Sequence, residues 1–270
     1  MKSQGKIVIA PGSDFTAPAP PKSQAKITLC GESKVGKTTF ALRYAPDPVA
    51  LINFDGRAGY AAREAVQAGR RIITTEIRVP GDINRMGEDA VKKAGQAAID
   101  KTMKNLEWAV RESQKGNVRT ICFDTGTEYG NFLTLAFRGK LGLIKDYGKS
   151  KDLINQQLLR LYQVAAEGNA HLVMLTRARA TWAGEEPSGK FEPRAYEVLS
   201  EAADIVAHLR FRKAGKGKIG KDSEIEILSA GTDRSQLGAV YRESDWEDLG
   251  GPFVYTCLMN YPGTTPEDWQ

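Results

Sequence analysis

Apolar and polar residues follow two kinds of pattern along the chain. Short, nearly continuous apolar runs bounded by turn residues are typical of strands that are buried on both faces of a sheet. The sequence predicts four of them, at 26–30, 49–54, 119–124 and 171–176. Between these runs, apolar residues recur with helical spacing. The predicted helices cover 38–44, 82–114 and 152–167.

The order of these elements indicates the fold class. Strands that alternate with helices form a mostly parallel sheet with helices on both faces. Two further strands are predicted at 203–211 and 224–228, and the Gly-rich turn between them is too short for a helix. We therefore expect an α/β fold whose mostly parallel central sheet carries an antiparallel hairpin at one edge.

The two ends of the chain lack this regular pattern. Residues 11–24 are rich in Pro, Ala and Ser, which favours a surface arm over a folded element. The sequence after Ala230 is less regular and contains several Gly and Pro. We accordingly divide the chain into a flexible N-terminal arm at 1–24, an α/β core at 25–249 and a C-terminal tail at 250–270.

Composition narrows the class of protein. With 41% hydrophobic and 26% charged residues, the chain is typical of soluble globular proteins. No apolar run approaches the length of a membrane span, and the run at 7–10 is too short for a secretory signal, so we expect a cytoplasmic protein. Three widely spaced cysteines and two histidines give no metal-binding spacing. The net charge of +5 is compatible with nucleic acid but does not require it.

One motif carries specific chemistry. Residues 31–38, GESKVGKT, match the pattern G-x-x-x-x-G-K-[ST] between a predicted strand and a predicted helix. In this motif the backbone N–H groups converge on phosphates at a helix N-terminus, the Lys reaches the β- and γ-phosphates, and the hydroxyl binds Mg²⁺. The alternative is a Gly-rich turn with an exposed Lys, and the flanking strand and helix argue against it. The predicted nucleotide-binding residues are Gly31, Glu32, Ser33, Lys34, Val35, Gly36, Lys37, Thr38 and Thr39.

A phosphate-binding loop of this kind needs a second carboxylate, at the end of a neighbouring buried strand, to hold the metal. Asp124 follows the apolar run 120–123 and is the predicted partner of Thr38 in a Mg²⁺ site, with a strand-end cap as the alternative. The catalytic base stays open between Asp55, which follows the second strand, and Glu128. Asp55 is slightly favoured because strand ends in such sheets open onto the ligand crevice.

Together these motifs resemble the RecA-like P-loop ATPases, in particular a compact group common in bacteriophages that includes single-strand annealing and recombination proteins. The resemblance covers 25–249. The segments that carry it are GESKVGKTTFAL (31–42), LINFDG (51–56), TICFDTGTEY (120–129), HLVMLTRAR (171–179), ADIVAHLRF (203–211) and GTDRSQLGAVYRESDWEDL (231–249).

The resemblance implies a RecA-like ATPase core that binds ATP and Mg²⁺ through Lys37, Thr38 and Asp124. It also implies that the end of the fourth strand carries a γ-phosphate sensor, where this chain has Thr176 and Arg177. Arg177 is therefore grouped with the catalytic candidates.

The chain departs from the family pattern after the second strand. RecA-type proteins end this strand with an acid, one residue and then the catalytic Glu, whereas here Asp55-Gly56 is followed by Arg57. Fast hydrolysis is therefore not predicted. Arg57 is instead a candidate for contact with phosphate or with a neighbouring subunit.

Two basic segments are candidates for binding nucleic acid or a neighbouring subunit. Segment 210–221 is cationic and Gly-rich, which suits a loop along a nucleic-acid backbone, a set of cations in the ATP site of an adjacent subunit, or a solvated hairpin tip. Segment 177–194 is predicted to be a long loop that offers charge and stacking surface to a single strand, or an ordered lid. The candidate residues are Arg179, Trp182, Lys190, Arg210, Arg212, Lys213, Lys216 and Lys218.

Three functions are open at this point. The leading hypothesis is an ATP-dependent homo-oligomer, ring or filament, that binds single-stranded DNA in recombination or annealing and works in the host cytoplasm if it is phage-encoded. The second is a nucleotide-binding regulatory or assembly module with little hydrolysis, which Arg57 favours. The third is a small-molecule kinase, which would need 177–194 as an arginine-bearing lid.

Overall fold

A computed structural model gives the arrangement of the central part of the chain. It describes residues 24–54, 56–79, 82–141, 148–184, 186–193, 198–214, 218–230 and 237–242. The predicted arm, apart from Gln24, and the predicted tail at 250–270 lie outside the described residues. The division into arm, core and tail therefore stays a prediction.

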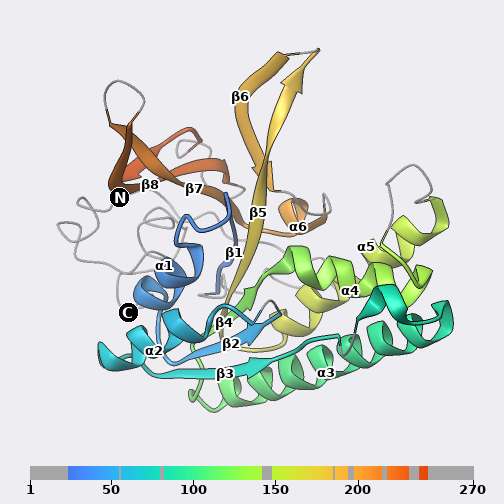
Figure 1. Ribbon diagram of the computed structural model, residues 1–270. Coiled ribbons are helices and arrows are strands. Elements are labelled where there is room, and N and C mark those ends of the chain that lie inside the picture. Colours follow the sequence, from blue (N-terminus) through green and yellow to red (C-terminus); the bar gives the residue numbers. More distant parts are fainter. Residues whose placement is uncertain are drawn as a thin grey trace, which may run out of the picture.

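A nine-stranded sheet forms the centre of the molecule (Figure 1). Its strands are β1 Lys26–Gly31, β2 Val49–Asn53, β3 Ile72–Glu76, β4 Thr120–Asp124, β5 His171–Ala183, β6 Glu186–Pro193, β7 Ile205–Ala214, β8 Lys218–Ala230 and β9 Val240–Arg242. They lie in the order β3-β2-β4-β5-β1-β7-β8-β9, and β6 pairs with β5. The strands from β3 to β7 in this order are parallel, whereas β8, β9 and β6 join antiparallel. The predicted α/β class with an antiparallel edge is confirmed.

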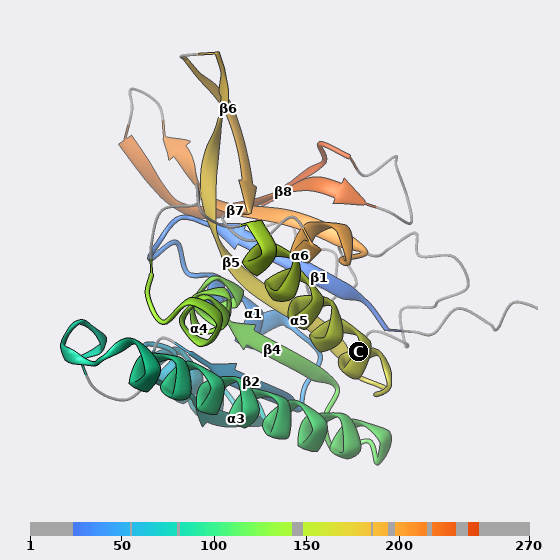
Figure 2. The same cartoon turned by 90° about the vertical axis from the view of Figure 1, so that its right-hand side faces the viewer.

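Helices cover both faces of this sheet. They are α1 Lys37–Tyr44, α2 Gly59–Gln67, α3 Glu88–Gln114, α4 Gly126–Arg138, α5 Gly148–Ala166 and the short α6 Val198–Glu201, with a 3₁₀ turn at Ile83–Arg85. Side chains of α1 and α2 join one buried cluster, and side chains of α3 to α6 join the other. In Figure 2, helices α3, α4 and α5 lie on the face of the sheet nearest the viewer. Within the described residues, no helix is both long and apolar enough to cross a membrane.

Strand β1 is central and is buried on both faces. Ile27 and Leu29 pack in the cluster that includes α1, because alternate strand residues point to opposite faces. On the other face, the Thr28 hydroxyl donates to the Leu199 carbonyl at 2.7 Å. The carboxyl end of β1, where the phosphate-binding motif begins, is therefore fixed from both sides.

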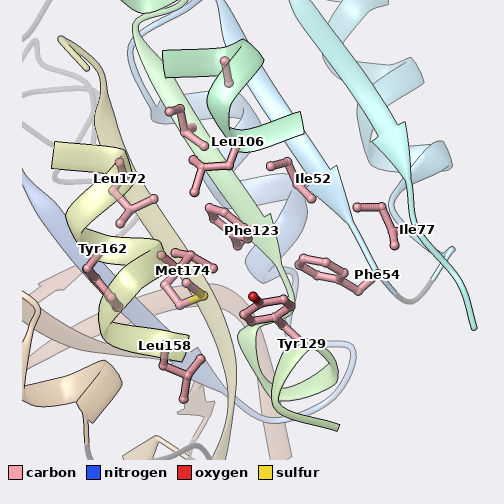
Figure 3. Packing of buried hydrophobic residues seen from close by; sticks show 14 of the residues in the cluster. Ile52, Phe54, Ile77, Leu106, Phe123, Tyr129, Leu158, Tyr162, Leu172 and Met174 are labelled. Atoms are coloured by element: carbon pink, nitrogen blue, oxygen red, sulfur yellow. The ribbon is translucent and has the colours of Figure 1, made fainter. Parts of the chain in front are cut away.

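An aromatic cluster joins the ends of β2 and β4 to α4 (Figure 3). The ring of Phe54 lies 5.9 Å from that of Phe123, 5.6 Å from that of Tyr129 and 5.7 Å from that of Phe132. Such aromatic pairs add to the stability that burial provides. The cluster fixes the start of α4 against the strand end that carries Asp124.

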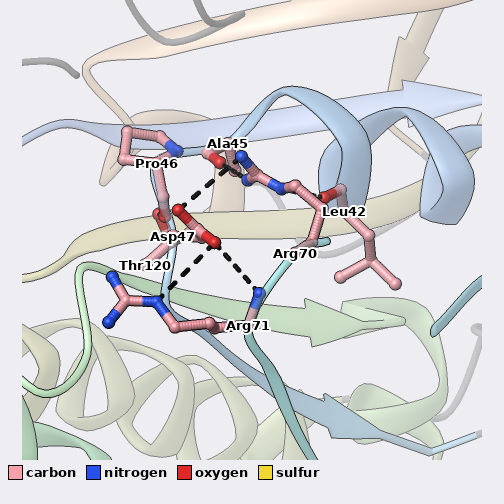
Figure 4. Close-up of polar contacts among 7 residues, drawn as sticks. All are labelled: Leu42, Ala45, Pro46, Asp47, Arg70, Arg71 and Thr120. Carbon is pink, nitrogen blue, oxygen red and sulfur yellow. Dashed lines mark hydrogen bonds and ion pairs between the residues drawn. The ribbon is translucent and has the colours of Figure 1, made fainter. Parts of the chain in front are cut away.

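At the opposite end of the strands, polar contacts connect the segment between α1 and β2 to the residues just before β3 (Figure 4). Arg70 donates to the Leu42 carbonyl at 3.2 Å and also to the Ala45 carbonyl, so a cation satisfies acceptors at a helix C-terminus. Asp47 accepts from the backbone N–H of Arg71 at 3.0 Å. These contacts lie at the amino ends of β2 and β3, whereas the phosphate-binding motif follows the carboxyl end of β1, so we assign them a structural role.

The pattern of the sequence did not reveal α2, β3 or α4. Helix α2 buries only Ala61, Ala62 and Ala65, whose small side chains give a weak periodic signal. Strand β3, at the sheet edge, is largely exposed, so it lacks the apolar run that marks an interior strand. The predicted helix at 82–114 begins instead at Glu88, after the 3₁₀ turn.

The expectation of a long loop at 177–194 was wrong. Strand β5 continues to Ala183 and returns through Gly184, with φ 70°, into the antiparallel β6 (Figure 1). A polar alternation, with Arg177, Arg179 and Thr181 at every second position, suits a two-stranded ribbon that has no helix packed on it. The segment is therefore a β-hairpin that extends from the sheet.

Candidate nucleotide-binding site

The phosphate-binding motif lies at the carboxyl end of β1 and at the N-terminus of α1, as predicted. Gly36 caps α1 in a left-handed conformation with φ 90°, which glycine adopts without strain. The backbone N–H groups at a helix start are unsatisfied and attract anions. The Lys37 side chain is buried with 8% exposure, and its Nζ donates to the carbonyls of Gly31 at 2.9 Å and Glu32 at 2.7 Å. An amine is thus held inside the curve of the loop.

Gly31 allows the close approach of neighbouring backbone. A Cβ atom there would lie 2.6 Å from the Leu209 carbonyl oxygen and 2.9 Å from Val35 Cγ1. We expect Gly31→Ala to lower the free energy of unfolding by about 1–3 kcal/mol, because a backbone oxygen cannot move away cheaply. Urea denaturation measures this. Gly59→Ala is the matched control, since a Cβ at Gly59 meets nothing within 4 Å; equal losses in both variants would contradict the steric account.

The predicted metal ligands Thr38 and Asp124 meet in the structure. Thr38 Oγ1 donates to Asp124 Oδ2 at 2.7 Å, although the residues come from α1 and from β4, which is separated from β1 by β5. Asp124 is 3% exposed, so its carboxylate is held firmly. A hydroxyl beside one carboxylate fits Mg²⁺, which prefers few protein oxygens and keeps several waters. Among the described residues there is no group of three or more His, Cys, Asp or Glu that suits another metal centre.

The candidate catalytic residues Glu128 and Arg177 form an ion pair. Arg177 Nη2 lies 2.7 Å from Glu128 Oε1. Arg177 stands in register with Gly31, so the pair lies at the same edge of the sheet as the motif. The neighbouring Thr176 is fully buried, and its hydroxyl has no hydrogen-bond partner within the described part of the chain. The other candidate base, Asp55, lies outside the described residues.

Two titratable side chains beside β1 are neutral at neutral pH. Burial raises the pKa of the Cys30 thiol to about 12, against the opposing effect of Lys37. Burial, and then Arg210 and Lys37, lower the pKa of His208 to about 4. His208 stands opposite Cys30 on β7 and stacks on Phe191, so β6 covers this end of β1. Cys30 therefore adds no negative charge beside Lys37, and His208 adds no positive charge.

The cationic candidates for nucleic acid are partly neutralised. Arg210 lies 2.6 Å from Glu224 and 2.7 Å from Glu226, and Arg179 lies 2.6 Å from Glu192. Lys190 is exposed. Contact of these residues with nucleic acid stays a prediction. The side chains of Trp182, Arg212, Lys213 and Lys218 and the whole of Lys216 lie outside the described part.

Some residues at this edge were not singled out by the sequence. Asn131 donates to Glu128 Oε2 at 3.0 Å, and Asn53 stands in register with Asp124. The three-residue spacing of Glu128 and Asn131 would have indicated contact if α4 had been predicted. The carboxylates that neutralise Arg210 could be paired with it only once the register of β7 and β8 was known.

Three comparisons relate the chain to known proteins. Two solved structures resemble the chain. A KaiC-like protein from the archaeon Pyrococcus horikoshii is 14% identical over 82% of this chain and 85% of its own, with a TM-score of 0.43. The RadB recombinase is 15% identical over 81% of this chain and 86% of its own, with a TM-score of 0.46. A search of curated proteins gave no match. The family model described as AAA domain matches residues 23–231, which is most of the chain. The chain therefore belongs to the AAA domain family and is a nucleotide-binding P-loop protein.

Proposed function

We propose that this protein is a magnesium-dependent ATPase that acts on single-stranded DNA as a homo-oligomer in recombination or annealing. One observation carries the nucleotide part of the proposal. The 2.7 Å contact between Thr38 and Asp124 lies beside a buried Lys37, so a hydroxyl, a carboxylate and an amine meet at one helix N-terminus.

Each of these groups has a distinct task with ATP. Lys37 would leave the Gly31 and Glu32 carbonyls and donate to the β- and γ-phosphates, where a charge-assisted hydrogen bond is stronger than a neutral one. Thr38 and Asp124 would hold Mg²⁺, which neutralises charge on the phosphates when bound. The N–H groups of the loop would bind the remaining phosphate oxygens.

The role on DNA is supported by the hairpin and by the resemblance to phage proteins. The β5–β6 hairpin starts at the nucleotide edge, since Thr176 and Arg177 are in register with Cys30 and Gly31, and it continues beyond the end of β1 (Figure 2). Arg179 and Lys190 place cationic groups on it. Such a ribbon suits electrostatic contact with a nucleic-acid backbone.

Turnover of ATP with and without single-stranded DNA tests this proposal, together with a mobility-shift assay on labelled DNA in ATP and Mg²⁺. We expect measurable hydrolysis, a higher rate with DNA, and a shifted band that weakens as salt rises. If the protein hydrolyses ATP, but the labelled DNA band does not shift and DNA does not change the rate, the ATPase part of the proposal stands and the DNA part fails. Absence of both nucleotide binding and hydrolysis would overturn the whole proposal.

A second function, a nucleotide-binding regulatory or assembly module with little turnover, is favoured by the state of Glu128. Both oxygens of this carboxylate already accept hydrogen bonds, at 2.7 Å and 3.0 Å. Together with Arg57 at the family's Glu position, this leaves the base for hydrolysis unassigned among the described residues. Tight ATP binding with negligible turnover and no response to DNA would select this function.

A further inference from the structure

The guanidinium of Arg177 is held beside the phosphate-binding loop with part of its surface open. Its backbone is in register with Gly31, and its side chain is 43% exposed. Nη2 donates to Glu128 Oε1 at 2.7 Å. Among the described residues, no side chain accepts from its Nε or Nη1, so these donors are available to a ligand at the carboxyl edge.

Glu128 is fixed more firmly than Arg177. Its side chain is 22% exposed, and its second oxygen accepts from Asn131 Nδ2 at 3.0 Å. Its backbone N–H donates to the Thr125 hydroxyl at 3.2 Å, which caps the first turn of α4. The carboxylate therefore has a set direction before any ligand binds.

A backbone contact ties the same two elements together. The N–H of Arg177 donates to Thr127 Oγ1 at 3.2 Å. Strand β5 and the first turn of α4 are thus joined both at the main chain and through the Arg177–Glu128 pair. This double connection limits how far the guanidinium can turn away from the edge.

The geometry of Glu128 suits a role in orienting Arg177 better than a role in abstracting a proton from water. A general base needs to reach the attacking water, whereas both Glu128 oxygens already have protein donors. A guanidinium is planar, with donors on more than one side, and can bind a carboxylate on one side and a phosphate on another. Glu128 accepts from Nη2 of Arg177, and 43% of the Arg177 side chain remains exposed.

The resemblance implies that Arg177 contacts the terminal phosphate. We propose that Glu128 and Asn131 are positioning residues that hold its guanidinium for this contact, and that this positioning sets the preference for a nucleoside triphosphate over a diphosphate. The inference rests on the proposed function, because it requires a nucleotide in the loop. Arg177 would contact the phosphate, Glu128 would set the direction of its guanidinium, and Asn131 would set the direction of Glu128.

The test compares the affinity of the full chain for ADP and for a non-hydrolysable ATP analogue, both with Mg²⁺, by calorimetry. We expect Arg177→Ala to lower the preference for the triphosphate by about tenfold to 100-fold, the value of a charge-assisted hydrogen bond. Glu128→Ala should lower it by about tenfold and Asn131→Ala by about threefold, with ADP affinity unchanged in each. Arg111→Ala, which removes an exposed arginine on α3, is the matched control and should leave the preference unchanged.

Two further measurements separate positioning from a structural role and from a role as base. Glu128→Gln keeps an oxygen acceptor and should recover part of the lost preference, and Glu128→Ala should add nothing to Arg177→Ala. If Glu128→Ala lowers only the turnover number and leaves the triphosphate preference intact, Glu128 is a base and the inference fails. If the parent binds both nucleotides and Arg177→Ala changes neither affinity, the inference fails alone; if the parent binds neither, the proposed function fails with it.

Discussion

Replacing Lys37 by methionine is expected to weaken the binding of ATP by at least about 100-fold. Methionine keeps an apolar stem of similar length in a position that is 8% exposed, so packing is largely preserved and the amine is removed. Loss of two charge-assisted hydrogen bonds to phosphate corresponds to about 3 kcal/mol or more, which is a factor of about 100 in affinity. Calorimetric titration with MgATP measures the change, and circular dichroism verifies that the variant is folded.

The control is a second lysine of the same loop. Lys34 is exposed and has a φ of 66°, so Lys34→Asn removes a charge while asparagine tolerates this left-handed conformation. We expect less than about a threefold effect, since an exposed charge is screened by solvent. An equal loss in Lys34→Asn and Lys37→Met would mean that net charge, not the position of the Lys37 amine, controls binding.

The site could be predicted from the sequence where its parts are adjacent along the chain. The loop from Gly31 to Thr38 brings its own glycines, lysine and hydroxyl, and its flanking strand and helix have clear apolar patterns. Asp124 could also be predicted, because the apolar run of a buried strand that ends in an acid is recognisable in the sequence alone. The sequence also paired this acid with Thr38, but only the structure shows that a strand, β5, lies between β1 and β4 and that the two side chains are 2.7 Å apart.

Contacts that depend on strand order could not be predicted from the sequence. Glu128 and Arg177 are 49 residues apart, and they meet because β4 and β5 are neighbours and α4 begins directly after β4. No periodicity within either segment encodes that meeting. The β5–β6 hairpin was missed for another reason: residues 177–183 lack the apolar run that marks a strand inside the sheet, and a strand outside the core does not need one.

Replacing Asp124 by asparagine should separate magnesium-dependent chemistry from nucleotide binding. Asparagine has nearly the same shape, and its Oδ1 can still accept from Thr38, so the local packing around this 3% exposed side chain is retained. The negative charge, which the metal requires, is lost. We expect ATP turnover to fall by about 100-fold or more, because metal neutralisation of phosphate charge contributes several kcal/mol to catalysis. Affinity for nucleotide in the presence of EDTA should change by less than about threefold.

Thr38 provides the internal control for this prediction, because it holds the other end of the same contact. Thr38→Ser keeps the hydroxyl and should retain most of the turnover, whereas Thr38→Val removes it and should reproduce the defect of Asp124→Asn. The double variant Asp124→Asn with Thr38→Val should be hardly worse than either single change, since groups that serve one metal act as a unit. Additive losses would show that the two residues act separately and would contradict a shared metal site. A loss of nucleotide affinity in EDTA would point the same way, because in the absence of metal only a distorted loop would weaken binding.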